Sequence, residues 1–242
     1  YNKLRIANAP ISTSSPKLRR SRLGAAMALF MQSLDATIFN TALPSIASDL
    51  HEPAFEMQMA IIAYSLSVAL FIPLTAWAAA KFGTLTVFRS AVATFVLGSI
   101  GCAFAPNLNT LVLARVVQGI GGAFMMPVAR LAIIQVVPKQ QLLNAWNLMA
   151  TAGAVGPILG PILGGWLVMN ASWHWIFLIN IPIGALGILA SGSVMNNIKG
   201  ESEKLDWTGF LLFAIHLREL LNYWIQLDRS RVSNACIAVS YT

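Results

Sequence analysis

Two charged residues lie deep inside apolar stretches of this chain, Asp35 and Arg115. A charge in the middle of a hydrocarbon layer costs from a few to more than about ten kcal/mol, so such residues usually face a cavity or a partner of opposite charge. A carboxylate in that setting takes up or releases a proton according to whether a cation lies beside it. The pair therefore predicts a proton-coupling site, with a static ion pair joining two helices as the alternative.

Polar and adaptable side chains recur near this pair. Gln32 and Phe39 share a helical face with Asp35, and Gln118 follows Arg115 by three residues. Methionine and aromatic side chains accept varied apolar ligands, although plain packing is the commoner use of each. The chain has further side chains of this kind at Tyr64, Met125, Met126, Asn147 and Met149. For a small amphipathic or cationic substrate we predict a site formed by Gln32, Phe39, Tyr64, Gln118, Met125 and Asn147.

No residue pattern predicts enzymatic chemistry. The glycines of VQGIGGAF lie inside an apolar helix rather than between a strand and a helix, so they do not fit a nucleotide-binding loop. The three histidines, His51, His174 and His216, have no companions at the spacing that zinc requires. We therefore expect no enzyme activity, no cofactor and no metal site.

The composition explains where these residues must reside. Hydrophobic residues make up 57% of the chain and charged residues only 10%, whereas soluble domains have about 25% charged residues. The net charge of +7 comes from the N-terminal segment and short connections between apolar runs. This distribution favours orientation in a lipid bilayer over binding to nucleic acid.

Six apolar runs have the length of about twenty residues that crosses a bilayer. Lysines and arginines fall before the first run and in every second connection, so the positive-inside rule places the N-terminus in the cytoplasm. We expect an all-α integral membrane protein in the plasma membrane, of the bacterial inner-membrane kind. Its expected spans are Gly24–Ala47, Gln58–Ala80, Leu85–Ala105, Leu108–Ala129, Asn144–Met169 and Trp173–Val194.

The fifth expected span carries glycines four residues apart, at Gly156, Gly160 and Gly164. Small residues at this spacing share one helix face and let another backbone come close. Pro157 and Pro161 would break such a helix in water, but neighbouring helices in a membrane can supply partners to the freed carbonyls. The pattern predicts a helix that bends and packs closely.

The expected organisation has four parts. They are a basic cytoplasmic segment at 1–22, a six-helix transmembrane bundle at 23–195, a cytoplasmic linker at 196–206, and a truncated seventh helix with a tail at 207–242. The apolar run WTGFLLFAI is too short to span a bilayer. The stretch after it has the apolar spacing of a helix on the membrane surface, and a truncated or frame-shifted reading explains the abrupt end equally well.

Four strings resemble the N-terminal half of a major facilitator superfamily transporter, especially the fourteen-helix drug:proton antiporters of the EmrB/QacA type. LDATIFNTALPSIASDL and LVLARVVQGIGGAF resemble the signatures of the first and fourth helices, and WHWIFLINIPIG resembles the entrance to the sixth. GPILGPILGGWL fits the antiporter pattern GxxxGPxxGGxL. The resemblance implies proton-driven export, with Asp35 and Arg115 in coupling and an antiporter motif at Gly156, Gly160, Pro161, Gly164 and Gly165.

The chain departs from the family in two ways. Ala80 stands where the loop between the second and third helices normally has an acidic residue, and Leu85 and Thr86 replace its basic pair, which puts gating in doubt. Alternating access also needs two bundles, and we expect one here. We therefore expect the missing C-terminal half or a second copy as a partner, beside protons and the bilayer. The rival interpretation is a non-transporting orphan half-bundle that binds a partner or is a decayed gene product.

Overall fold

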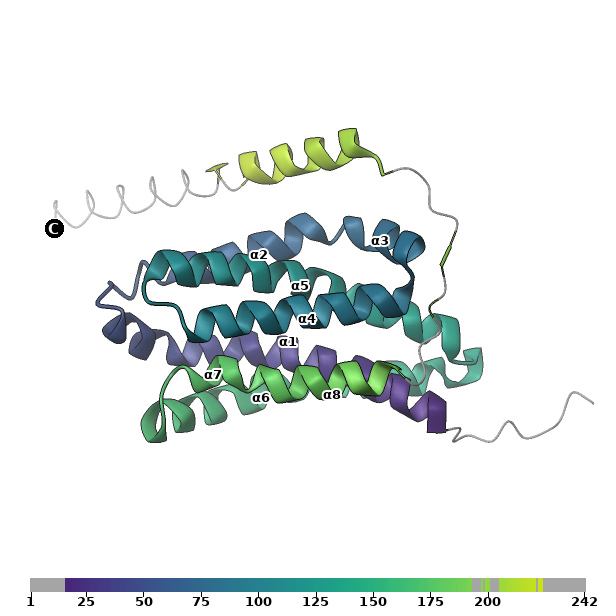
Figure 1. Ribbon diagram of the computed structural model, residues 1–242, viewed down its shortest axis with the longest axis horizontal. Coiled ribbons are helices and arrows are strands. Elements are labelled where there is room, and N and C mark those ends of the chain that lie inside the picture. The colour runs from purple at the N-terminus through teal and green to yellow at the C-terminus, as the bar shows by residue number, and fades with distance from the viewer. Residues whose placement is uncertain (1–15, 193–196, 198, 201–204, 221, 224–242) are drawn as a thin grey trace, which may run out of the picture. The chain divides into compact units, whose positions relative to one another are not determined.

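The computed structural model describes residues 16–192, 197, 199–200, 205–220 and 222–223. It divides into two units, Tyr1–Ser202 and Glu203–Thr242, which we describe separately. Within the described part of the first unit, every regular element is a helix, which confirms the predicted all-α class. The helices are α1 (Pro16–Asp49), α2 (Gln58–Phe71), α3 (Leu74–Phe82), α4 (Thr84–Ala103), α5 (Leu108–Val136), the short 3-10 turn η1 (Lys139–Gln141), α6 (Leu142–Asn170), α7 (Trp175–Leu178) and α8 (Asn180–Gly192) (Figure 1).

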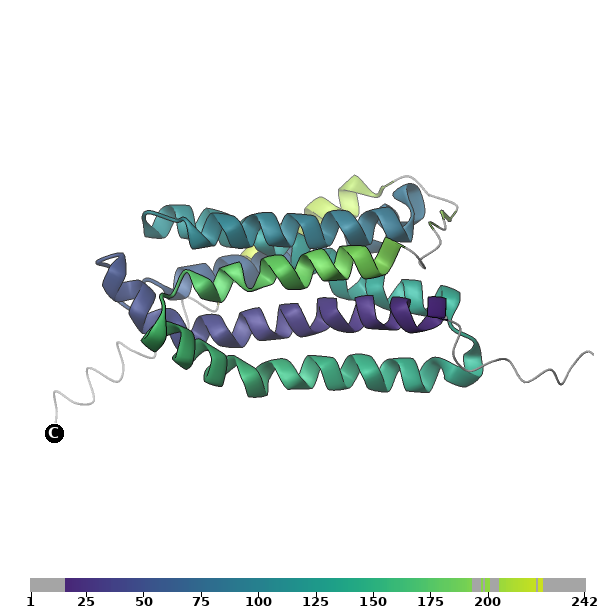
Figure 2. The same cartoon turned by 60° about the horizontal axis from the view of Figure 1, so that its bottom comes forward.

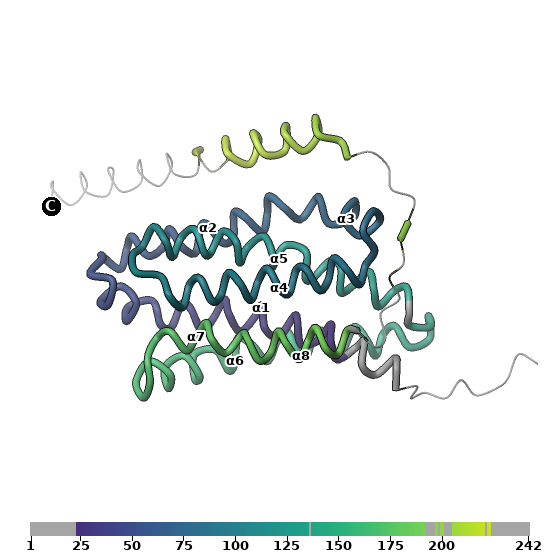
Figure 3. The backbone as a smooth tube through the Cα atoms, viewed as in Figure 1, coloured from purple at the N-terminus to yellow at the C-terminus, as the bar shows by residue number. Residues whose placement is uncertain are grey.

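Among the described residues, three stretches are long and apolar enough to cross a membrane: α4, Leu108–Gln135 within α5, and Lys139–Asn170. The second predicted span is broken into α2 and α3, which together qualify as a fourth but are bent by 59° (Figure 3). Pro73 lies at the break, where its ring removes a backbone donor. The predicted count of six included two further segments: α1, which carries Asp35, and Trp175–Ser191, an apolar helix shorter than this criterion requires.

Helix α1 occupies a central place in the first unit. It packs along α6 on one side and along α8 on the other, and it also contacts α5 (Figure 2). Helix α5 in turn packs against α4 and α2. Residues on α1 and α5 are therefore surrounded by helices on several sides, which is the setting in which a buried charge finds partners.

The glycine face of α6 lies directly against α1. A Cβ added at Gly156 would lie 2.7 Å from Oγ of Ser33, one at Gly164 would lie 3.0 Å from Cγ1 of Ile38, and one at Gly160 would collide with Thr37. Gly165 points elsewhere, since an added Cβ there would meet nothing within 4 Å. The close approach of the two backbones is therefore limited to the three glycines that share one helical face.

Proline in α6 is accommodated by the same contact. Pro157 has no N–H to offer the carbonyl of Gly153, four residues earlier, and the hydroxyl of Ser33 on α1 donates to that carbonyl at 2.7 Å. A neighbouring helix thus supplies the partner that proline removes, as the sequence predicts for a membrane helix.

The second unit is described over a helix at 207–220. Asp206 begins this helix, because its Oδ1 accepts a hydrogen bond of 2.9 Å from the backbone N–H of Gly209. The helix continues beyond His216, where the apolar run ends. Most of the predicted tail, 224–242, lies outside the described residues, as does 1–15 of the predicted basic segment, and α1 already begins at Pro16.

Candidate functional site

The two intramembrane charges form an ion pair. Nη1 of Arg115 on α5 lies 2.6 Å from Oδ2 of Asp35 on α1, and the two side chains are only 2% and 1% exposed. Neither charge faces the outer surface of the bundle. Either charge would be very costly to bury alone, and in the pair each charge neutralises the other.

Gln118 connects the two charges. Its Nε2 donates to Oδ1 of Asp35 at 2.7 Å, and its Oε1 accepts from Arg115 at 2.9 Å. Gln118 lies one helical turn after Arg115, so both side chains leave α5 on the same face. Gly98 makes room for it, since an added Cβ there would lie 2.6 Å from the backbone nitrogen of Gln118.

Two residues that the sequence did not predict complete the hydrogen-bond network. Nδ2 of Asn180, at the start of α8, donates to Oδ1 of Asp35 at 3.1 Å and to Oγ of Ser99 at 3.1 Å. Ser99 on α4 also accepts from Gln118 at 2.9 Å. Asn180 and Ser99 are both fully buried. The carboxylate on α1 is therefore held by side chains from α5 and α8 and braced from α4.

Aromatic rings surround the guanidinium of Arg115. Its Cζ lies 3.8 Å from the ring centre of Phe39, 5.2 Å from that of Tyr64 and 5.5 Å from that of Phe177. These are distances at which a cation is attracted to the face of an aromatic ring. The rings also exclude water, so the ion pair interacts in a medium of low dielectric constant.

This geometry makes the hydrogen-bond network sensitive to a proton on Asp35. An ionised carboxylate only accepts hydrogen bonds, whereas a protonated one presents a donor on one oxygen. Both oxygens of Asp35 already receive hydrogen bonds from N–H donors. Oδ1 already accepts from two amides, so a proton there must displace Gln118 or Asn180. Oδ2 accepts from Arg115, and a proton there removes the negative charge that attracts the guanidinium.

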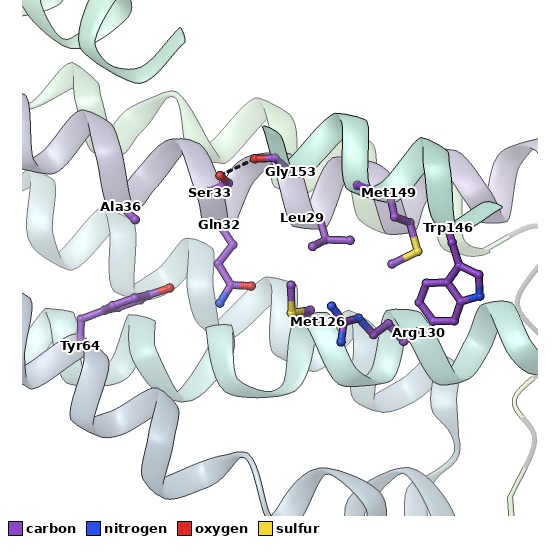
Figure 4. Close-up of a pocket in the computed structure, with 11 residues that line it drawn as sticks. Leu29, Gln32, Ser33, Ala36, Tyr64, Met126, Arg130, Trp146, Met149 and Gly153 are labelled. Carbon is purple, nitrogen blue, oxygen red and sulfur yellow. Dashed lines mark hydrogen bonds between the residues drawn. The ribbon is translucent and has the colours of Figure 1, made fainter. Parts of the chain in front are cut away.

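A cavity of about 560 Å³ lies beside this network, between α1, α2, α5 and α6 (Figure 4). Two residues of the predicted substrate site, Gln32 and Tyr64, line it. Its wall is otherwise mostly apolar, which is typical of a binding cavity for small organic molecules. The remaining lining residues are Leu29, Ser33, Ala36, Met126, Arg130, Trp146, Met149, Ala150 and Gly153.

The other four predicted substrate residues do not line this cavity. Phe39 stacks on Arg115, and Gln118 is committed to Asp35. Met125 is fully buried in the core, while its neighbour Met126 faces the cavity, because adjacent residues of a helix point about 100° apart. Asn147 is exposed on α6 away from the cavity wall.

Arg130 and Trp146 are the main residues of the cavity that the sequence did not single out. Arg130 follows an apolar span, where a basic residue is read as a marker of orientation, and tryptophan near a span end is read as an interface anchor. Only the fold shows that both turn toward the cavity (Figure 4). Among the described residues, no three histidine, cysteine, aspartate or glutamate side chains come together as metal ligands.

Comparisons with known proteins show which family this sequence resembles. A family model described as Major Facilitator Superfamily matches residues 25–234. Probable transport protein HsrA of Haemophilus influenzae is 83% identical over 207 residues, which make up 86% of this chain and 45% of that protein. Putative multidrug resistance protein MdtD of Salmonella typhi is 50% identical over 206 residues, 85% of this chain and 43% of that one. The chain thus spans less than half the length of these curated relatives.

Solved structures show the same fold at low sequence identity. The proton:xylose symporter XylE superposes with a TM-score of 0.68 at 13% identity, over 75% of this chain and 46% of that chain. The peptide transporter POT in complex with sulfate superposes with a TM-score of 0.64 at 14% identity, over 91% of this chain and 47% of that one. In both cases this chain matches about half of a longer helical protein.

Proposed function

The chain belongs to the Major Facilitator Superfamily, and from this premise we propose that it forms the N-terminal bundle of a drug:proton antiporter of the EmrB/QacA type. Membership makes it a multi-pass membrane transporter protein and not an enzyme. The finer assignment is supported by the glycine face of α6 against α1, by the four family strings, and by a relative named as a multidrug resistance protein.

The single observation that carries proton coupling is the Asp35–Arg115 pair with its surrounding donors. In the proposed cycle Asp35 takes up a proton when the site opens to the side of higher proton concentration. The proton displaces one amide from Oδ1 or removes the charge that attracts Arg115, and this loosens α1 from α5 or α8. Loss of the proton on the other side restores the hydrogen bonds, so that protonation is linked to a change in helix packing.

The substrate site in this proposal is the cavity beside that network. Gln32 and Tyr64 supply its polar contacts, and Met126 and Met149 supply an adaptable apolar wall. Both polar side chains lie close to the backbone of Gly122 on α5. A Cβ there would lie 3.0 Å from the Tyr64 hydroxyl and 3.3 Å from Nε2 of Gln32. Tyr64 touches both the cavity and Arg115, so occupancy of the cavity is linked to the ion pair.

Transport by alternating access requires a second bundle. We propose that a C-terminal bundle, or a second copy of this one, covers the cavity, and that the N-terminus is cytoplasmic in a bacterial plasma membrane. The basic residues before α1 and in alternate connections support this orientation.

Everted membrane vesicles test the proposal. The chain is co-expressed with the remainder of HsrA as a separate polypeptide, and energy-dependent accumulation of two fluorescent amphipathic dyes is followed: ethidium, a cation, and fluorescein, an anion. We expect accumulation of one dye, collapse of it by a protonophore, and loss of it in Asp35→Asn. Glu56→Gln, in the exposed connection after α1, is the matched control that keeps activity.

Two results would overturn the proposal. Equal accumulation by Asp35→Asn and by the unaltered chain would reduce the ion pair to a static contact between helices. Failure of both dyes to accumulate when both polypeptides are present in the membrane would remove the drug-export assignment.

A further inference from the structure

The charge that lines the cavity is positive. Among the described residues that line it, Arg130 is the one charged residue, and none is acidic. The nearest acidic group in the network, Asp35, is 1% exposed and paired with Arg115. The remaining polar lining groups, including Gln32 and Tyr64, are neutral. Within the described part of the chain, a ligand in this cavity therefore meets one positive charge and no negative one.

Arg130 is turned along the cavity wall. It lies six residues before the end of α5, about 9 Å along the helix axis, close enough for an arginine to extend toward the aqueous interface. Instead its guanidinium lies with Cζ 5.9 Å from the ring centre of Trp146 on α6 (Figure 4). Arg130 as a whole residue is exposed, and none of its described neighbours in the cavity is acidic.

This combination fits one class of ligand. A guanidinium offers a planar fork of donors that matches a carboxylate or a sulfonate. Trp146, Met126 and Met149 beside it supply apolar surface for an aromatic or aliphatic body. A cationic ligand would instead bring a second positive charge into an apolar cavity whose described lining residues include no carboxylate to offset it.

We propose that this cavity selects amphipathic organic anions, with Arg130 as the residue that binds the anionic group and determines specificity. The inference rests on the proposed function in taking this cavity as the substrate site, and it narrows the substrate class of that site. Of the amphipathic or cationic substrates that the sequence predicts, it favours amphipathic molecules that carry a negative charge. Specificity arises because Arg130 attracts the anion and repels the cation.

Equilibrium binding in nanodiscs of phosphatidylcholine, which has no net charge, tests the proposal without a proton gradient. Three probes share one aromatic body: naphthalene sulfonate, naphthylmethanol and naphthylmethyl trimethylammonium. We expect the sulfonate to bind most tightly to the full chain. In Arg130→Gln the affinity for the sulfonate should fall about tenfold or more, which corresponds to the loss of a charge-assisted hydrogen bond. The affinity for the neutral alcohol should not change.

Two further variants separate charge from structure. Arg130→Lys keeps the charge but loses the planar fork, so it retains part of the sulfonate affinity. Arg89→Gln removes an arginine of α4 whose Nε contacts Oγ of Ser191 at 3.4 Å outside the cavity, so it leaves sulfonate binding unchanged. Unchanged binding of naphthylmethanol shows that the cavity is still formed in each variant.

Three outcomes would overturn the proposal. The cation could bind as tightly as the sulfonate, Arg130→Gln could leave sulfonate affinity unchanged, or Arg89→Gln could reduce it as much. In the second case Arg130 would only brace α5 against Trp146. Because the binding assay does not involve Asp35, its failure is distinct from a failure of proton coupling in the vesicle experiment.

Discussion

Asn180 and Asp35 are 145 positions apart in the sequence, yet the amide of Asn180 donates to Oδ1 of Asp35 at 3.1 Å. Through this hydrogen bond α8 closes on α1, and Ser99 on α4 binds the same amide. The carboxylate of Asp35 is thus part of the contacts that hold the bundle together. A change in its protonation would alter the hydrogen bonds that join α1 to α5 and α8.

Breaking the buried ion pair from one side should be strongly destabilising. Asp35→Asn and Arg115→Gln should each lower the free energy of unfolding by about 3–5 kcal/mol, because each leaves a buried charge or donor without its partner. The double variant should be less destabilised than the sum of the two. Reversible unfolding in mixed detergent micelles measures this double-mutant cycle. In the control cycle, the effects of Glu56→Gln and Arg115→Gln on the free energy of unfolding should add. Additivity in the Asp35 cycle would show that the two charges do not interact.

The contact between α1 and α6 should depend on which glycine is altered. Gly160→Ala places a Cβ against Thr37 and should cost about 1–3 kcal/mol through overpacking. Gly165→Ala adds the same methyl group where nothing lies within 4 Å, so it should be neutral or stabilise the helix by about 0.5–1 kcal/mol. Thermal unfolding in detergent compares the two. Equal melting temperatures would mean that the glycine face does not set helix packing.

Asn180 should matter more than another asparagine that also donates a hydrogen bond. Asn180→Ala removes donors to a buried carboxylate and should cost about 1.5–3 kcal/mol, the range for hydrogen bonds to charged groups. Asn170→Ala removes an exposed amide that donates to the carbonyl of Trp166, and should change stability by less than about 0.5 kcal/mol. Unfolding midpoints that are equal for the two variants would remove Asn180 from the network.

A tryptophan just before α7 forms a hydrogen bond with the C-terminal end of α1. Nε1 of Trp173, which is 4% exposed, donates to Oδ2 of Asp49 at 2.8 Å. Trp173→Phe loses this hydrogen bond and should cost at least about 0.5–1.5 kcal/mol. Trp175 is 54% exposed, so the same change there should have little effect on stability. Protease accessibility of the connection after α1 measures the difference, and it should rise only for Trp173→Phe.

The residues that sequence alone could predict are those whose burial is costly. Asp35 and Arg115 stand out because a charge within an apolar run demands an explanation, and Gln118 follows from helical spacing. Asn180 and Ser99 were not predicted, because one polar residue in an apolar run says nothing about which distant helix supplies its partner. Met125 and Met126 show the same limit, since the rotation of a helix about its axis decides which of two neighbours reaches the cavity.

The sequence pattern also did not predict at which proline a helix breaks. The run from Gln58 to Ala80 has the length and apolar character of one span, but Pro73 separates it into α2 and α3. Pro157 and Pro161, by contrast, remain inside α6. For Pro157, the hydroxyl of Ser33 supplies the freed carbonyl of Gly153 with a donor, and the sequence does not reveal which helix provides it.

Infrared difference spectroscopy of the full chain in nanodiscs, recorded while the pH is lowered, tests whether Asp35 itself takes up a proton. We predict a carboxylic acid band that appears on acidification and disappears in Asp35→Asn but not in Glu56→Gln. It also predicts that amide bands of asparagine and glutamine side chains shift together with it, as Gln118 and Asn180 lose their acceptor. A carboxyl band that is identical in Asp35→Asn would show that Asp35 takes up no proton, and would contradict its role in coupling.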